Sequence, residues 1–146
     1  MVKDTQGGFL ISQIKQLGDR MFEKLLVEAG ISEFNGPQGR ILYVLWQEEN
    51  LPIVELSRRT SLAKTTLTGM LDRMEARGLV SRRFDPEDRR QIRIVLTEET
   101  RALREKYELV SRQANDIFYR GFTQEEVVRL ERALRRVLEN LRERGE

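Results

Sequence analysis

The sequence contains neither cysteine nor histidine. The chain therefore cannot form a disulfide, sense oxidants through a thiol or build the usual zinc site of Cys and His ligands. It also lacks the commonest general base of enzymes. Its Asp and Glu residues are scattered over charged stretches, without a glycine-rich phosphate loop or a nucleophile motif. We therefore expect no catalytic site, no cofactor and no bound metal.

Long apolar runs are also missing. No stretch approaches the roughly 18 consecutive apolar residues of a transmembrane helix, and residues 1–10 lack the basic-then-apolar order of a signal peptide. The chain has 146 residues, of which 34% are charged and 39% hydrophobic, as is ordinary for a helical protein in water. We expect one domain, residues 1–146, in the cytoplasm.

Positive charge is concentrated in the middle of the chain. The formal net charge is only +2, but residues 58–93 hold ten Lys and Arg against five Asp and Glu. Residues 1–57 hold five basic against eight acidic residues, and residues 94–146 hold eleven of each. A basic block is a candidate phosphate-binding surface, although a solvated surface can have the same composition. A motif within the block has to distinguish the two.

Apolar residues recur at intervals of three and four along most of the chain, which is the spacing of amphipathic helices. Gly78 stands where a left-handed helix end is favoured, and Thr123 and Glu126 have the spacing of a capping box. The expected helices cover residues 8–29, 37–49, 53–59, 63–77, 98–119, and a last segment from the capping box to about residue 144.

The periodicity changes between residues 79 and 96. Residues 79–84 and 91–96 are rich in β-branched and other apolar residues, and the charged segment 85–90 between them is typical of a turn. The expected fold is therefore mainly α with a small β-hairpin wing. In this winged helix-turn-helix, residues 53–77 form the helix-turn-helix and residues 79–96 the wing, within a lobe of residues 37–97.

The expected helix at residues 63–77 has an apolar and a polar side. The apolar side should face the core and consists of Leu67, Met70, Leu71 and Met74. In a helix-turn-helix the start of the second helix enters the major groove of DNA. The candidate contacts to bases and phosphates are Lys64, Thr65, Thr66 and Thr68, with Arg73 and Arg77 further along as contacts to the DNA backbone. The alternative is that these are only polar residues on the solvent side of a helix.

The tip of the expected hairpin carries Asp88, Arg89 and Arg90. An arginine on a thin extension suits the narrow, electronegative minor groove, and Asp88 could orient it through an ion pair. Alone, a charged hairpin tip is usually only solvated. Directly after a helix-turn-helix, it is typical of a wing.

From Val54 to Thr97 the sequence resembles the core signature of the MarR family, particularly at LDRMEARGLV, DPEDRR and IVLT. The resemblance implies a triangular homodimer, with an interface formed by residues of about 8–29 and 98–144, that binds a near-palindromic DNA site. It also implies that Lys64 to Thr68 take the recognition-helix positions, and that Arg90 enters the minor groove while Asp88 holds it. The organic-peroxide-sensing branch is similar at residues 65–79 but senses through a cysteine, so thiol sensing is excluded here.

Two further expectations concern small molecules and helix capping. Many members of this family lose DNA affinity when a small, often aromatic and anionic, effector binds between the dimer interface and the DNA-binding lobe. Tyr43 and Trp46 could line such a pocket, with Lys15 or Arg20 supplying charge; a core or interface role for both aromatic residues is the alternative. Ala63 stands where the family often has a capping Ser, so the recognition helix should begin without that cap.

The terminal helices keep apolar stripes that a three-helix core and a hairpin cannot wholly cover. These stripes either pack within the chain or pair with a second copy, and a symmetric dimer would bury both at once.

Three function classes follow. The first is a sequence-specific regulator of transcription that binds double-stranded DNA, expected to be a repressor modulated by a small molecule. The second is a nonspecific or architectural DNA-binding protein, and the third is an enzyme or helical interaction module on the same fold. Sequence preference separates the first two, because nonspecific binding is nearly all phosphate contact. The motifs favour the regulator, and nothing among them favours an enzyme.

Overall fold

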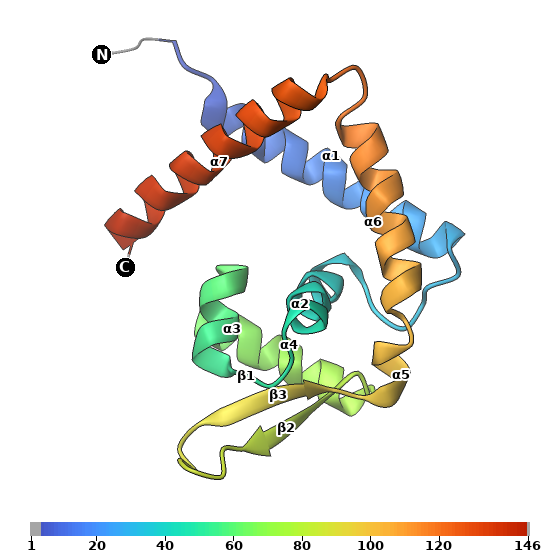
Figure 1. Cartoon of the computed structure of the whole chain (residues 1–146), viewed down its shortest axis with the longest axis vertical. Helices are drawn as coiled ribbons and strands as arrows, with labels where there is room; N and C mark the ends of the chain where they lie inside the picture. The colour runs from blue at the N-terminus through green and yellow to red at the C-terminus, as the bar shows by residue number, and fades with distance from the viewer. Residues whose placement is uncertain (1–3, 146) are drawn as a thin grey trace.

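The computed structural model describes residues 4–145, which form a lobe of short helices and a small sheet joined to three longer helices (Figure 1). The helices are α1 (Gly7–Glu28), α2 (Gly36–Gln47), α3 (Ile53–Thr60), α4 (Lys64–Ala76), α5 (Glu98–Arg101), α6 (Arg104–Phe118) and α7 (Gln124–Gly145). The strands are β1 (Leu51–Pro52), β2 (Val80–Phe84) and β3 (Ile92–Leu96). The expected mainly helical fold with a hairpin wing is confirmed.

The sheet has the order β1-β3-β2, with both pairs antiparallel. The hairpin pairs Val80 with Leu96 at its base and Phe84 with Ile92 near its tip. The sequence analysis did not predict β1, which pairs Leu51 with Ile94. A strand of two residues has no periodicity to detect, and its pairing partner lies more than 40 positions away in the sequence.

The single helix expected at residues 98–119 is wrong, because the chain breaks it into α5 and α6. An unbroken helix would direct the N–H of Arg104 to the carbonyl of Thr100. That carbonyl instead accepts the N–H of Leu103 at 3.1 Å and the indole N–H of Trp46 at 3.0 Å. A tertiary hydrogen bond from α2 therefore accompanies the break, and local periodicity could not predict it.

Local sequence signals fix the ends of the two helices that matter most for the lobe. The side chain of Asn35 accepts the N–H of Gln38 at the start of α2, and Gln38 returns a bond to the backbone of Asn35. After α4, Gly78 adopts φ +76°, and the N–H of Leu79 donates to the carbonyl of Met74 at 2.9 Å. This left-handed helix end turns the chain directly into β2.

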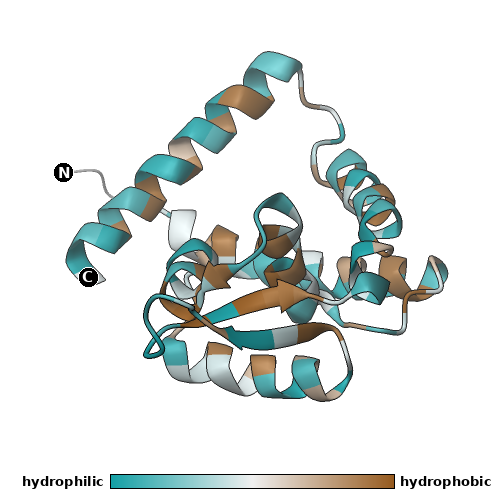
Figure 2. Cartoon of the chain, turned by 60° about the horizontal axis from the view of Figure 1, so that its bottom comes forward, coloured by the Kyte–Doolittle hydropathy of each residue, from teal (hydrophilic) through white to brown (hydrophobic). Residues whose placement is uncertain are grey.

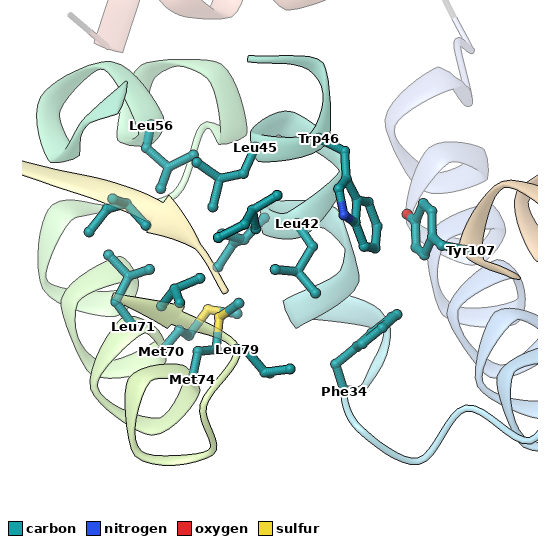
Figure 3. Packing of buried hydrophobic residues seen from close by; sticks show 14 of the residues in the cluster. Phe34, Leu42, Leu45, Trp46, Leu56, Met70, Leu71, Met74, Leu79 and Tyr107 are labelled. Carbon is teal, nitrogen blue, oxygen red and sulfur yellow. The ribbon is translucent and has the colours of Figure 1, made fainter. Parts of the chain in front are cut away.

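The core of the lobe lies where α2, α3 and α4 meet the sheet (Figure 3). Side chains from all four elements are fully buried there, including Leu42, Leu45, Leu56, Leu67, Leu71, Met74, Val80 and Ile94. The predicted inward side of α4 is thereby confirmed. Its packing fixes which face of α4 remains in solvent.

Tyr107 of α6 joins the lobe to the longer helices. Its ring centroid lies 5.0 Å from that of Trp46 and 5.7 Å from that of Phe22 in α1. Gly39 permits this approach, since a Cβ at that position would stand 2.9 Å from the Tyr107 ring. Burial disfavours the charged phenolate and raises the pKa of Tyr107 to about 12.

The helices α1 and α7 lie on the side of the molecule away from the sheet (Figure 1) and leave apolar side chains in solvent. Figure 2 shows apolar segments alternating with polar ones along α7. Exposed apolar residues on the two helices include Leu10, Ile14, Leu17, Leu134, Val137 and Leu141. Packing within one chain therefore does not bury these stripes. No helix in residues 4–145 is both long enough and apolar enough to cross a membrane.

Candidate nucleic-acid interface

The outer side of α4 presents all four residues expected at its start. Lys64, Thr65, Thr66 and Thr68 are exposed, while Leu67 between them is fully buried. The hydroxyl of Thr68 donates to the carbonyl of Lys64 at 2.8 Å. Outward, this residue therefore offers a methyl group and oxygen lone pairs.

The N-cap of α4 is Ala63, which makes no side-chain capping bond, as the sequence predicted. The first backbone N–H groups of a helix need an acceptor from outside the helix. A DNA phosphate oxygen is such an acceptor, and it also interacts favourably with the positive end of the helix dipole. The missing cap therefore suits a helix that points its start toward DNA.

The turn between α3 and α4 is compact and fixed by side chains. Ser61 adopts φ +59°, and the hydroxyl of Ser57 donates to the carbonyl of Leu62 at 2.6 Å. Thr60 is the last residue of α3. Its hydroxyl donates to the carbonyl of Leu56 at 2.8 Å, which satisfies the polar group within α3. The bond from Ser57 to Leu62 therefore ties α3 to the turn that precedes α4.

The wing tip places Arg90 in solvent and holds it from one side. Asp88 accepts the Arg90 Nε–H and its backbone N–H at 3.1 Å each, and the Arg90 side chain is 92% exposed. The predicted Asp88–Arg90 pair is thus present, and the neighbouring Arg89 is exposed as well. A hollow of about 160 Å³ lies between Arg90 and Lys64, so the wing and the start of α4 border the same space.

Asp85 organises the start of the loop at the wing tip, directly after β2. Its carboxylate accepts the backbone N–H of Glu87 at 2.8 Å and the Arg93 Nε–H at 2.9 Å, while Arg93 also donates to the carbonyl of Asn50 at 2.8 Å. The bond from the Glu87 backbone, followed by the one from Arg93, lowers the pKa of Asp85 below its ordinary value. The sequence analysis treated this residue only as part of a turn.

Arg82 of β2 is a second residue that the sequence analysis missed. Its guanidinium contacts the carboxylates of Glu75 and Asp72 in α4 at 2.8 and 2.7 Å. Side chains alternate along a strand, so Arg82 lies on the same side of β2 as the buried Val80. This alternation is the sequence signal from which its inward direction could have been predicted.

The two arginines expected to contact the DNA backbone occupy different surroundings. Arg73 lies beside Gly69 on the outer side of α4, where its Nη1 atom would stand 3.9 Å from a Cβ at Gly69. Arg77, the C-cap of α4, borders a hollow with Glu33 and Glu99. The carboxylates near Arg77 make its surroundings less favourable for a phosphate than those of Arg73.

A larger pocket of about 620 Å³ separates α1 from the lobe, and two of the four expected effector residues line it. Tyr43 and Lys15 do; Trp46 and Arg20 do not. Trp46 is only 7% exposed and belongs to the core, which is the alternative stated for it above. The other lining residues are Pro37, Arg40, Val44, Arg59, Thr60, Ser61, Leu62 and Met70.

Carboxylates accompany the cations of this pocket. Lys15 and Arg40 share the carboxylate of Asp19, and Arg59 contacts Glu48 and Glu55. Hydrogen bonds from Arg58 and then Arg59 lower the pKa of Glu55 to about 2. An anion entering the pocket would therefore meet cations that already have partners, with the aromatic side chain of Tyr43 beside them.

A helix-turn-helix followed at once by an antiparallel hairpin, with cations on both, defines a winged-helix DNA-binding protein. A sequence model of the MarR family matches residues 34–92. The chain is 38% identical over 103 residues to the HTH-type transcriptional regulator TtmR of Methylorubrum extorquens, a match that covers 70% of this chain and 51% of TtmR. The chain therefore spans about half the length of that relative.

Two other proteins match over most of their length. The chain is 30% identical to the multiple antibiotic resistance protein MarR of Escherichia coli, with 90% of each chain covered. A crystal structure of a mutant of that protein with operator DNA superposes with a TM-score of 0.80, covering 90% of this chain and 92% of the other at 29% identity. The structure of BpsR of Bordetella bronchiseptica, whose DNA binding is regulated by 6-hydroxynicotinic acid, superposes with a TM-score of 0.81 at 25% identity. The match covers 94% of this chain and 96% of BpsR. The chain belongs to the MarR family.

Acid should weaken the support that Asp85 gives to the wing. Since the folded-state pKa of Asp85 lies below its ordinary value of 3.8, its contribution to stability is present above that value and is lost as the pH falls through the folded pKa. Asp85→Asn should therefore lower the melting temperature at pH 7, and the difference from the parent should shrink toward pH 3. Thermal unfolding at a series of pH values measures this, with Glu87→Gln as the exposed control. A difference that stays constant with pH would contradict the assigned role.

Proposed function

We propose that the chain is a homodimeric, sequence-specific DNA-binding regulator of transcription, and that it represses its target until a small molecule lowers its DNA affinity. The observation that carries the proposal is that the start of α4 and the wing border the same hollow. The start of α4 presents Lys64 and three threonines, and the wing presents Arg90 across the same hollow. A helix and a thin hairpin placed in this way can contact a major groove and the adjoining minor groove of one DNA duplex.

On this proposal the residues divide by role. Lys64, Thr65, Thr66 and Thr68 contact base edges and phosphates in the major groove, and Arg73 and Arg77 contact the DNA backbone. Arg90 enters the minor groove, held by Asp88, with Arg89 beside it on the wing tip. The alternative remains a nonspecific or architectural binder, which would use the same cations without sequence preference.

Selection of bound duplexes from a random pool tests the regulator directly, and Arg90→Ala then tests the wing. The substitution should weaken binding to the selected duplex by about 1–3 kcal/mol, because it removes a groove contact. The melting temperature should hardly change, because the Arg90 side chain is 92% exposed. Fluorescence anisotropy with labelled DNA measures the affinity.

Arg73→Ala is the matched comparison. As a phosphate contact, it should weaken binding to selected and random duplexes alike and make the salt dependence shallower. Unchanged affinity after Arg90→Ala would remove the wing from the mechanism. Enrichment of no sequence in the selection would favour the nonspecific binder.

The apolar faces of α1 and α7 support the homodimer. Leu134, Val137 and Leu141 lie in solvent in the single chain, as do Leu10 and Leu17. Exposed apolar stripes of this kind are typical of a protein interface. A two-fold axis would pair both helices with their copies and place two α4 helices for half-sites about one turn of DNA apart.

Sedimentation should therefore give a dimer at micromolar concentration without DNA. Leu134→Arg combined with Val137→Arg should produce monomers, because two charges would be buried in an apolar interface. Inserting about five base pairs, half a helical turn, between the half-sites should abolish tight binding by the parent. A parent that sediments as a monomer would disprove the assigned interface.

The 620 Å³ pocket is the proposed effector site. Its Tyr43 ring suits the aromatic part of a small aromatic carboxylate, and its Lys15 suits the carboxylate. Its wall includes α1 and the turn between α3 and α4, so a bound molecule can change how the lobe sits on the longer helices. By linkage, a ligand lowers DNA affinity by the same factor by which DNA lowers ligand affinity.

Aromatic carboxylates at about 1 mM or below should weaken operator binding and change the emission of Trp46, the only tryptophan. Trp46 reports on the pocket through Tyr107, whose ring centroid lies 5.0 Å from that of Trp46 and 6.3 Å from that of Tyr43. Tyr43→Ala should reduce both responses, while Arg20→Ala, outside the pocket, should not. If a broad panel changes neither emission nor affinity, this class of effector is wrong.

A further inference from the structure

The side chain of Arg82 spans the space between the wing and the recognition helix. Its Nη1 donates to Glu75 at 2.8 Å, and its Nη2 donates to Asp72 at 2.7 Å and to the carbonyl of Thr68 at 3.3 Å. Its backbone N–H also donates to Glu75, at 3.0 Å. One residue of β2 is therefore bound to three residues of α4, spread over two helical turns.

The burial of this guanidinium distinguishes it from the other arginines near the interface. Its side chain is only 20% exposed, whereas that of Arg90 is 92% exposed. The backbone N–H of Arg82, followed by its guanidinium, lowers the pKa of Glu75 below its ordinary value. Both of its Nη atoms donate to α4, so this guanidinium is held by the protein rather than extended into solvent as that of Arg90 is.

Asp72 gives the contact its importance for DNA. This residue lies four positions after Thr68 on the outer side of α4, and its side chain is 65% exposed. A carboxylate on a face that approaches DNA is repelled by phosphates unless a cation accompanies it. Arg82 is that cation, at 2.7 Å.

We propose, on the basis of the function proposed above, that Arg82 is a positioning residue for DNA recognition: it ties β2 to α4 and neutralises Asp72. The tie sets the distance and angle between Thr65, which faces the major groove, and Arg90, which faces the minor groove. Both must fit one duplex at the same time. A wing that can move independently of α4 loses this match even when each element keeps its own shape.

The effect on folding should be smaller than the effect on recognition. Ion pairs near the surface contribute little to stability, because water and salt screen them. The core beneath α4 includes Leu67, Leu71 and Met74 but not Arg82. Recognition depends on the relative placement of two elements, which these bonds set directly.

The test compares Arg82→Ala with Arg83→Ala. Both remove one positive charge from β2, but alternation along the strand points Arg83 away from α4. The measured quantity is the ratio of affinities for the selected operator and a random duplex of equal length. Arg82→Ala should lower this ratio at least about tenfold, which corresponds to 1.4 kcal/mol. Arg83→Ala should change both affinities by the same factor and leave the ratio as it was.

Two further measurements identify positioning rather than a direct contact or a loss of folding. Asp72→Asn in the Arg82→Ala background should recover part of the affinity, because it removes the carboxylate that had lost its partner. Arg90→Ala should cost less in the Arg82→Ala background than in the parent, since the loosened wing no longer places Arg90 in its groove. Arg82→Lys, which keeps the charge but not the two-pronged geometry, should lie between the parent and Arg82→Ala.

Several outcomes would overturn the proposal. They are an unchanged affinity ratio in Arg82→Ala, strictly additive effects with Arg90→Ala, or no recovery by Asp72→Asn. If Arg82→Ala does not fold, Arg82→Lys carries the same comparisons. A parent that selects no DNA sequence refutes the proposed function itself. A parent that selects a sequence while Arg82→Ala matches it refutes only the role of Arg82.

Discussion

The contact between Trp46 and Tyr107 is the interaction on which the arrangement of the molecule depends. It brings the indole of α2 against the ring of α6 with 5.0 Å between centroids (Figure 3). The same indole donates to the carbonyl of Thr100, where the chain breaks between α5 and α6. One side chain thus sets both the junction and the direction in which α6 leaves the lobe. The position of α4 and the wing relative to the exposed faces of α1 and α7 follows from this contact.

Charge pairing gives the lobe a second level of order. Arginines that join elements of the fold form ion pairs with carboxylates. Arg93 pairs with Asp85, and Arg101 pairs with Glu49. Arg90 also has a partner, Asp88, yet its side chain remains in solvent. The ion pairs of Arg93 and Arg101 neutralise charge within the fold and hold its loops. The pair of Arg90 with Asp88 orients the Arg90 side chain but leaves it in solvent. The basic middle of the sequence therefore contains arginines held within the fold, such as Arg93, and arginines exposed to solvent, such as Arg90.

The sequence predicted those features that depend on neighbours in the chain. Helical spacing located the helices of the lobe, the alternation of residues 79–96 located the hairpin, and the inward side of α4 followed from Leu67, Leu71 and Met74. What it missed depends on distant partners: β1 needs β3, the break after α5 needs Trp46, and the role of Arg82 needs α4. Trp46 was a candidate for both the effector pocket and the core, and its burial in the fold distinguishes the two.

The hydrogen bond within α4 at Thr68 restricts the hydrogen bonds that this residue can make to a partner outside the helix. Because the hydroxyl proton is directed at the carbonyl of Lys64, the outer side of Thr68 can accept a hydrogen bond or touch a methyl group, but it has no proton to donate. In the major groove, guanine presents only acceptors, whereas adenine and cytosine present an amino group and thymine a methyl group. While that bond is kept, a guanine edge opposite Thr68 would leave two acceptors facing each other. If Thr68 contacts a base as proposed, this one bond within the helix would make the position disfavour guanine.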